Sequence, residues 1–301
     1  QVRWVPNEII RGVANDTPVM GYGVNTSNLL RLWSAESHEA FDFSAFNSGD
    51  YLGAVHRSIR SSTVSKVLYP NDDSDTGKRL RLIRQHFFVS CSLQDMIRLH
   101  VHAQLPLEKF HERFAVQLND THPAIAVAEL MRLLVDVHRM DWERAWEVTR
   151  QTFSYTNHTL LSEALECWAL PLFANLLPRH MEIIYEINRR FLDEVRARFP
   201  GDEGLAQRLS LIDERPPKFI RMAHLASVGS HTINGVAALH SELLKQTVLG
   251  DFHHIAPEKF TNVTNGVTPR RFLMLSNRQL RGLLDRKSTR LNSSHITNLV
   301  C

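Results

Sequence analysis

The sequence predicts an α/β protein in which helices cover both faces of a parallel sheet. Short apolar segments near residues 114, 153 and 219 have the length and composition of buried strands. Segments with apolar residues at helical spacing lie between them, and this alternation is typical of a parallel sheet. No internal repeat or linker interrupts the pattern, so residues 1–286 are expected to be one domain or a piece of one.

The composition is that of an ordinary soluble protein. The 301 residues are 43% apolar and 22% charged, with 35 Lys and Arg against 32 Asp and Glu. The interspersed charges and the net charge of +3 argue against a nucleic-acid or membrane-surface partner. No run approaches the roughly 18 apolar residues of a membrane helix, and no signal peptide is expected. Three cysteines without metal or redox spacing fit a reducing, cytoplasmic compartment.

The N-terminal part of the chain combines short strands with two helices. Alternating apolar and polar positions predict a run of short strands over residues 1–35, ending at Leu29–Trp33. Gly49–Val67 is expected to be a helix, and Tyr69–Gly77 an acidic, turn-rich surface loop. A long helix then runs from about Lys78 to His100.

The middle of the chain carries the clearest alternation of strands and helices. Proline suits the first position of a helix, and aspartate accepts hydrogen bonds from the free N–H groups there. A Pro-Gly pair ends a helix. These rules predict the strand Phe114–Leu118, the helix Pro123–His138, the helix Trp142–Thr152 after an Asp141 cap, the strand Phe153–His158, and the helix Pro178–Arg198 before Pro200-Gly201.

The stretch 219–245 is predicted to be a strand, a turn and a helix. Phe219–Leu225 is short and apolar, and Gly229–Thr232 contains the small residues of a turn. From Ile233 the apolar residues recur at helical spacing as far as Lys245. This pattern places His231 on a loop at the carboxyl end of a strand, where α/β sheets bind ligands. The alternative is that His231 only makes loop or cap hydrogen bonds.

Three polar turns follow predicted strands, at Asn119–His122, Tyr155–His158 and Ser230–His231. In an open α/β sheet the loops at the carboxyl ends of the strands converge on one crevice. Asn, Asp, Thr and His side chains suit hydrogen bonding to sugar hydroxyls. The three turns are therefore expected to share a site. The alternative is that these side chains simply cap helices and turns.

Other chemistries have little support in the sequence. It lacks His-Glu-x-x-His, Cys-x-x-Cys, Gly-x-Ser-x-Gly, Gly-x-Gly-x-x-Gly and Walker patterns, which argues against metal, serine-hydrolase and nucleotide sites. Asp72, Asp73 and Asp75 offer carboxylates for a glycosidase, but a flexible acidic loop is more typical of a solvated surface. Trp142 and Trp146 are suited to stacking on sugars, although core packing is the commoner use of such a pair.

Several longer segments carry a resemblance, and they cover nearly all of residues 1–285. These segments are Asn25–Ser34, Val67–Asp72, Gln117–Pro123, Tyr155–Thr159, Leu177–His180, Ile183–Asn188, Met222–Leu225, Gly229–His231, Asn234–Val236 and Thr264–Arg271. In this order they resemble the glycogen (α-1,4-glucan) phosphorylase family. Several matches of five or more residues in register make the resemblance specific.

The resemblance implies a fold and an activity. The fold is the two-domain GT-B type, with Rossmann-like domains facing each other across an active-site cleft. This chain would be part of the first domain. The implied reaction is phosphorolysis, in which inorganic phosphate takes the terminal glucose of an α-1,4-glucan and releases glucose 1-phosphate. Pyridoxal 5′-phosphate on the second domain relays a proton through its phosphate. The family's members are allosteric, cytoplasmic and usually homodimeric.

The resemblance also implies site residues. His231 is similar to the family's active-site histidine, which binds the glucosyl 6-hydroxyl and turns its carbonyl toward the developing positive charge. The implied substrate-binding residues are Asn71 and Asp72 in a loop over the substrate, Arg81 behind that loop, and Asp120 and His122 in the pocket. Asp73 departs from the family pattern, because Asn is frequent there in the animal enzymes. An added negative charge at the mouth would oppose an anionic substrate.

The family's cofactor lysine lies in a Gly-Thr-Gly-Asn-Met-Lys-like segment that is absent here. Both ends of the chain look cut, and the Ser/Thr/Asn-rich residues 287–301 are expected to be a non-native or disordered tail. The chain alone is therefore expected to be inactive. A non-catalytic glucan-binding fragment is the alternative, and a sugar-nucleotide glycosyltransferase of the same architecture is a further one.

Overall fold

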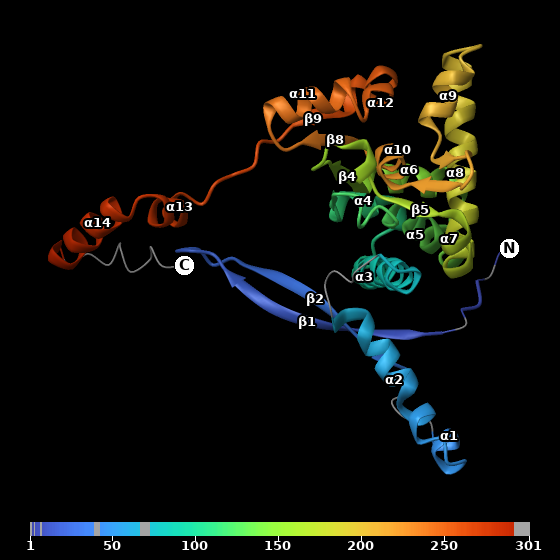
Figure 1. Ribbon diagram of the computed structural model, residues 1–301, viewed down its shortest axis with the longest axis horizontal. Helices are drawn as coiled ribbons and strands as arrows, with labels where there is room; N and C mark the ends of the chain where they lie inside the picture. Colours follow the sequence, from blue (N-terminus) through green and yellow to red (C-terminus); the bar gives the residue numbers. More distant parts are fainter. Residues whose placement is uncertain (1, 3, 7, 39–42, 67–72, 292–301) are drawn as a thin grey trace.

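The computed structural model describes residues 2, 4–6, 8–38, 43–66 and 73–291, without the side chains of 45, 54–57 and 287–291. Its centre is a four-stranded parallel sheet in the order β3-β4-β8-β9, surrounded by helices (Figure 1). A two-stranded and a three-stranded antiparallel sheet, β1-β2 and β5-β7-β6, lie outside it. Two arms extend from this body, formed by α1 with α2 and by α13 with α14. The α/β class with a parallel sheet is confirmed.

The strands are short except in the first hairpin. They are β1 Ile10–Met20, β2 Ser27–Ser37, β3 Val116–Asn119, β4 Phe153–Thr156, β5 Cys167–Ala169, β6 Ile212–Asp213, β7 Phe219–Arg221, β8 Thr232–Gly235 and β9 Phe260–Asn262.

The helices range from one turn to 28 residues. They are α1 Phe43–Asn47, α2 Tyr51–Lys66, α3 Asp75–His102, α4 Phe110–Arg113, α5 Ala126–Arg132, α6 Trp142–Thr152, α7 Leu170–Leu176, α8 Pro178–Arg198, α9 Glu203–Leu209, α10 Met222–Gly229, α11 Ala238–Gln246, α12 Gly250–Ile255, α13 Pro269–Ser276 and α14 Arg278–Leu291. Further helical segments of three to five residues occur at Leu107–Lys109, Leu133–Val137, Ser162–Ala164 and Pro257–Lys259.

The two faces of the parallel sheet differ in polarity. Leu118, Tyr155 and Ile233 are neighbours in register and fully buried, because that face packs on the helices. On the opposite face, Thr156 donates to Asn234 at 2.8 Å and accepts from Gln117 at 2.8 Å. Gln117 is exposed. The expectation that helices cover both faces is therefore wrong for β3 in this chain, because its outer face is polar.

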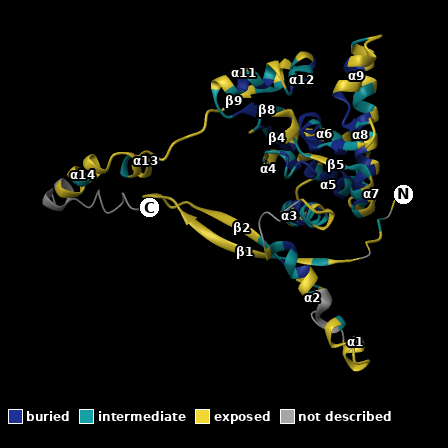
Figure 2. Ribbon diagram, viewed as in Figure 1, coloured by how far each residue is buried: buried dark blue, intermediate teal, exposed yellow. Residues whose placement is uncertain are grey.

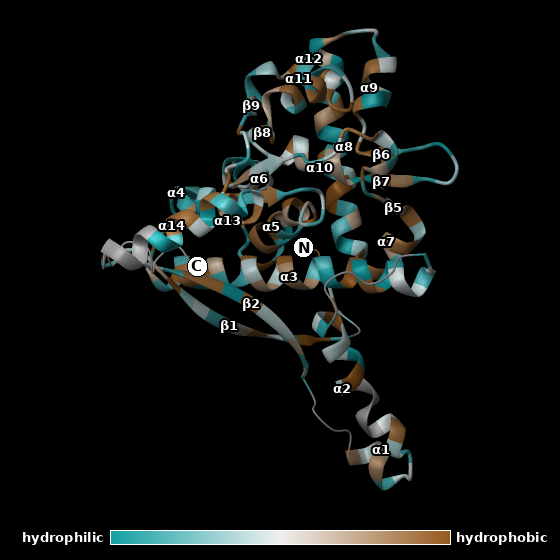
Figure 3. Cartoon of the chain, turned by 60° about the vertical axis from the view of Figure 1, so that its left-hand side comes forward, coloured by the Kyte–Doolittle hydropathy of each residue, from teal (hydrophilic) through white to brown (hydrophobic). Residues whose placement is uncertain are grey.

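The core lies between the sheet and the helices that pack on it. Figure 2 shows the buried residues gathered around β4, α5, α6 and α8, and Figure 3 shows the hydrophobic residues concentrated there. In α5 every residue from Ala126 to Met131 is buried, including Glu129. Gly229 of α10 sits against Val127 of α5, where a Cβ would come within 2.5 Å of a valine methyl. Glycine at this position lets the two helices approach closely.

A run of short strands was expected over residues 1–35, but the structure has one long hairpin, formed by Ile10–Met20 and Ser27–Ser37. All eleven residues of β1 pair with β2, and its base is attached to α3. Trp33 donates its indole N–H to Ser92 at 3.1 Å, and Arg31 pairs with Asp95. Near the tip, large apolar side chains such as Met20 and Leu29 are exposed. Figure 1 shows this part of the hairpin extending away from the body.

The prediction for 219–245 is wrong in its order of elements. Only Phe219–Arg221 is a strand, Met222–Gly229 is the helix α10, and the expected helix start is instead the strand β8. A short apolar run that is buried all round gives no periodicity that separates a helix from a strand. The helices predicted at 142–152 and 178–198 are confirmed at the same bounds. No helix in the described part of the chain could span a membrane.

Candidate functional site

The turn after β3 forms one side of the site. Asp120 has φ of 66°, in the left-handed region that non-glycine residues rarely adopt. Its N–H donates to the carbonyl of Thr156 at 3.0 Å, and its carboxylate accepts from the N–H of Thr121 at 2.6 Å. Such strained residues persist where the surroundings hold them, and they cluster at functional sites. The conformation presents Asp120 and His122 at the carboxyl edge of the sheet.

A cavity of about 190 Å³ opens beside this turn, between it and helix α3. Arg81 and Gln85 line it from α3, and His122 lines it from the turn. Glu166, just before β5, holds the two α3 side chains. It accepts from the Gln85 amide at 2.8 Å, and its carboxylate lies 3.3 Å from the Arg81 guanidinium. The structure thus brings Arg81 and His122, two of the residues that the resemblance implies for substrate binding, to one cavity.

Glu166 is a buried carboxyl with a shifted pKa in this region. Burial raises the pKa of its carboxyl, although the Gln85 hydrogen bond and the Arg81 charge oppose the rise. The Glu166 Oε2 atom is buried and has no hydrogen-bond partner among the described residues. Below this region the buried Tyr155 hydroxyl accepts from Asn157 at 3.2 Å, and burial raises the pKa of the Tyr155 hydroxyl. A buried carboxyl at a cavity is a candidate proton donor or hydrogen-bonding group.

The turn after β4 brings a second histidine to the same edge. His158 is exposed, and its Nε2 lies 2.5 Å from the Asn119 side-chain oxygen at the end of β3. Because β3 and β4 are parallel and paired, the residues that follow them are neighbours at one edge. The carboxyl edge therefore carries His158 together with Asp120 and His122. Two of the three predicted polar turns share this edge.

The third predicted turn lies at the opposite edge. His231 precedes β8, and its N–H donates to the carbonyl of Phe153 at the start of β4. Its ring nitrogens lie 3.3 Å from the Ser154 hydroxyl and 2.7 Å from that of Thr232. The expectation that His231 follows a strand is wrong, because α10 replaces most of the predicted strand and β8 begins after the histidine. The structure does not bring His231 to the carboxyl edge.

The remaining predicted residues divide between described and undescribed parts of the chain. Asn71 and Asp72 lie outside the described residues. His158 was recognised only as part of a polar turn, and Glu166 was missed. Glu166 stands between a helical turn and a short strand, and no local pattern marks it. Its place beside the cavity follows only from its contacts with Gln85 and Arg81 of α3, and Gln85 lies 81 residues earlier in the chain.

The amino edge has a cavity of its own, of about 160 Å³. Trp142 and Trp146 line it and also pack against the core, in agreement with the packing role expected for them. Arg190 stands over the Trp142 ring at 5.2 Å. Lys259 lines the same cavity and donates to the carbonyl of Ser227 at 3.1 Å, and burial lowers the pKa of the lysine to about 8.

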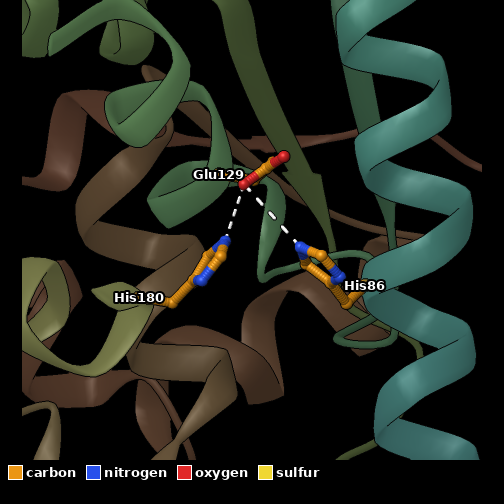
Figure 4. Close-up of side chains that lie close together, drawn as sticks. All are labelled: His86, Glu129 and His180. Carbon is orange, nitrogen blue, oxygen red and sulfur yellow. Dashed lines mark hydrogen bonds and ion pairs between the residues drawn. The ribbon is translucent and has the colours of Figure 1, made fainter. Parts of the chain in front are cut away.

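One buried group has the residue types of a metal site. His86, Glu129 and His180 place their ligand atoms within 4.8 Å of one another (Figure 4). Glu129 is already saturated, because Arg132 donates to both of its oxygens at 2.7 and 2.9 Å and His180 lies 2.6 Å away. A cation would have to displace the Arg132 charge from the same carboxylate. The geometry therefore favours a structural hydrogen-bond network.

Burial and hydrogen bonding act in opposite directions on this network. Burial alone would raise the pKa of Glu129, but hydrogen bonds from Arg132 and His180, together with His86 at 3.8 Å, hold it well below its ordinary value. Burial lowers the pKa of His180 to about 4 against the attraction of Glu129. The neutral His180 ring donates its Nε2–H to Glu129, and its Nδ1 has no acceptor for a second proton among the described residues.

Comparison with known proteins agrees with the sequence resemblance. Residues 1–300 match the carbohydrate phosphorylase family. The chain is 60% identical over 299 residues to a glycogen phosphorylase of Synechocystis sp., covering 99% of the chain and 35% of that protein. It is 48% identical to a glycogen phosphorylase of Chlamydia trachomatis (98% and 36% covered) and to the brain form of Homo sapiens (99% and 36%). The chain thus spans about a third of the length of these relatives.

Proposed function

Because the chain belongs to the carbohydrate phosphorylase family, we propose that it is part of an α-1,4-glucan phosphorylase. The proposed reaction transfers the terminal glucose of a glycogen or maltodextrin chain to inorganic phosphate and releases glucose 1-phosphate. The observation that carries the proposal is the cluster of Asp120, His122 and His158 at the carboxyl edge of a parallel sheet, where α/β proteins bind ligands. The protein would act in the cytoplasm as a homodimer.

In this proposal the carboxyl edge binds the sugar. The Asp120 carboxylate accepts hydrogen bonds from hydroxyls, and the histidine rings donate or accept according to their tautomer. His158 is better placed than His231 to be the active-site histidine, because it shares an edge with Asp120 and His122. Arg81 and Glu166 lie beside His122 and complete a polar wall. Asn71 and Asp72 keep their expected roles as substrate-binding residues.

The cofactor is assigned to another part of the protein. Pyridoxal phosphate in this family needs a lysine for its attachment, and none of the residues lining the carboxyl-edge cavity is a lysine. The chain's residues there do not fit as the covalent anchor, so no step is routed through the group. We propose that the cofactor is held by the part of the relatives' length that this chain does not span.

The test compares two histidine variants in the full-length protein. His158→Ala is expected to lower kcat/KM for phosphorolysis of maltoheptaose by about a hundredfold or more, because a group that contacts the reacting sugar is lost. His231→Ala is the matched control and should change the rate by less than about threefold. Glucose 1-phosphate release is measured by a coupled assay. If His231→Ala lowers kcat/KM more than His158→Ala does, then His231 is the active-site histidine and this assignment is wrong.

A second candidate function is glucan binding without cleavage, because the chain spans only about a third of the length of its relatives. A chain that spans about a third of a phosphorylase has only part of the proposed cleft, so by itself it would bind glucan without cleaving it. Maltoheptaose binding by the 301-residue chain without release of glucose 1-phosphate would support this. Release of glucose 1-phosphate by the purified chain would contradict it.

A further inference from the structure

Arg84 is a buried cation that has no carboxylate partner among the described residues. Its side chain extends from α3, and the residue is 4% exposed. The Nε atom donates to the carbonyl of Val64 at 2.6 Å. The Nη1 and Nη2 atoms are buried and find no hydrogen-bond partner in the part of the chain that the structure describes.

A buried guanidinium without acceptors for its N–H groups is unfavourable unless a ligand or water supplies those acceptors. An arginine stays charged in proteins and carries five donors, so burial leaves its free N–H groups without the water that would solvate them. Buried charges in native proteins are paired, and an unsatisfied buried donor normally signals a bound ion, a bound water or a functional role. Burial also lowers the pKa of Arg84, because removing the guanidinium from water disfavours its charged form.

Arg84 is one of the residues that line the carboxyl-edge cavity. Arg81, one helical turn earlier on α3, lines the same cavity, as does His122. Phe88, Val89 and Pro123 provide apolar walls. The cavity, about 190 Å³ in volume, is therefore lined by two arginines and a histidine together with apolar residues. Guanidinium groups bind carboxylates and phosphates through paired N–H donors, and a low-dielectric surround strengthens such bonds.

We propose that this cavity binds a small oxyanion, the phosphate or carboxylate group of a low-molecular-weight ligand, through the Nη atoms of Arg84. The anion supplies the acceptors that Arg84 lacks and neutralises its charge. The same chemistry is available from a carboxylate side chain in the part of the relatives' length that this chain does not span. The proposal does not depend on the phosphorylase activity, since an inactive chain would still bind the anion.

The experiment titrates the 301-residue chain with inorganic phosphate and follows thermal unfolding. Sodium chloride holds the ionic strength constant, so that general screening does not contribute. A ligand that binds only the folded state raises Tm in a saturable manner. Arg84→Met removes the donors while keeping the aliphatic volume. Arg98→Met is the matched control on the same helix, because Arg98 is exposed and pairs with Asp95.

Phosphate is expected to raise the Tm of the wild-type chain and of Arg98→Met. Arg84→Met should weaken the apparent affinity by roughly tenfold or more, since charge-assisted hydrogen bonds are lost. Without phosphate, Arg84→Met should melt at or above the wild-type temperature, because it removes an unpaired buried charge; a merely structural arginine would give a lower Tm.

Two results would overturn the proposal: no saturable effect of phosphate on the wild-type chain, or the same effect in Arg84→Met. Comparison with the full-length protein then identifies the source of the anion. A phosphate response in both proteins supports a free ligand. A response in the chain that disappears in the full-length protein supports a carboxylate of the remaining sequence in the same role.

Discussion

Replacing Arg132 by Met tests whether the buried Glu129 network stabilises the fold. The Arg132 side chain is 13% exposed, and it donates to Glu129 at 2.7 and 2.9 Å. Its guanidinium also packs over the Trp4 ring at 5.4 Å. Met keeps most of the aliphatic volume and removes the charge. Glu129, which is fully buried, then loses its cation.

The expected loss follows from the burial of Glu129. Removing one partner of a buried ion pair costs about 3–5 kcal/mol, because the other charge remains without compensation. Glu129 would keep its hydrogen bonds to Ser90 and His180, so we expect a value near the lower limit. A domain is stable by roughly 5–15 kcal/mol, and the variant should therefore stay folded with a clearly reduced midpoint.

Urea unfolding at pH 7, followed by tryptophan fluorescence, measures this loss. Arg189→Met is the control, since Arg189 is 57% exposed where it pairs with Glu186 and should contribute less than about 1 kcal/mol. The double variant Arg132→Met, Glu129→Gln should recover much of the loss, because a neutral amide replaces the unpaired carboxylate. A loss for Arg132→Met no greater than that of the control would refute the argument that burial makes this pair important.

Two further predictions concern packing and pH. Gly229→Ala should lower the stability by about 1–3 kcal/mol in denaturant unfolding, because the new methyl would lie 2.5 Å from a Val127 methyl. Gly266→Ala is the control, because its Cβ would meet nothing within 4 Å. Equal losses of stability in the two variants would contradict the clash. Burial lowers the pKa of His180 and His224 to about 4, below the ordinary 6.5. The stability that the two neutral rings contribute to the folded state is therefore complete above pH 6.5 and is lost as the pH falls toward 4. Each should account for roughly 3 kcal/mol of that loss, and unfolding curves from pH 7 to 4 that show no decline would contradict it.

The sequence alone determined the fold class and the strongest helices. Apolar stripes and terminal signals are local, so the helices at 142–152 and 178–198 could be predicted with their approximate ends. Adjacent polar turns after β3 and β4 could also be predicted to meet, because paired parallel strands end at one edge. The family resemblance was equally a property of the sequence, and the match over residues 1–300 confirms it.

Only the tertiary structure decided the positions of His231, Glu166 and Arg84. The edge of the sheet at which His231 lies depends on whether the short, buried apolar run before it is a strand or a helix. Periodicity does not distinguish the two when every side of the run is covered. The surroundings of Glu166 and Arg84 depend on which side chains from distant segments contact them: Gln85 bonds to Glu166, and no described residue bonds to the Arg84 Nη atoms. Such contacts arise from packing between elements far apart in the chain, and no local pattern records them.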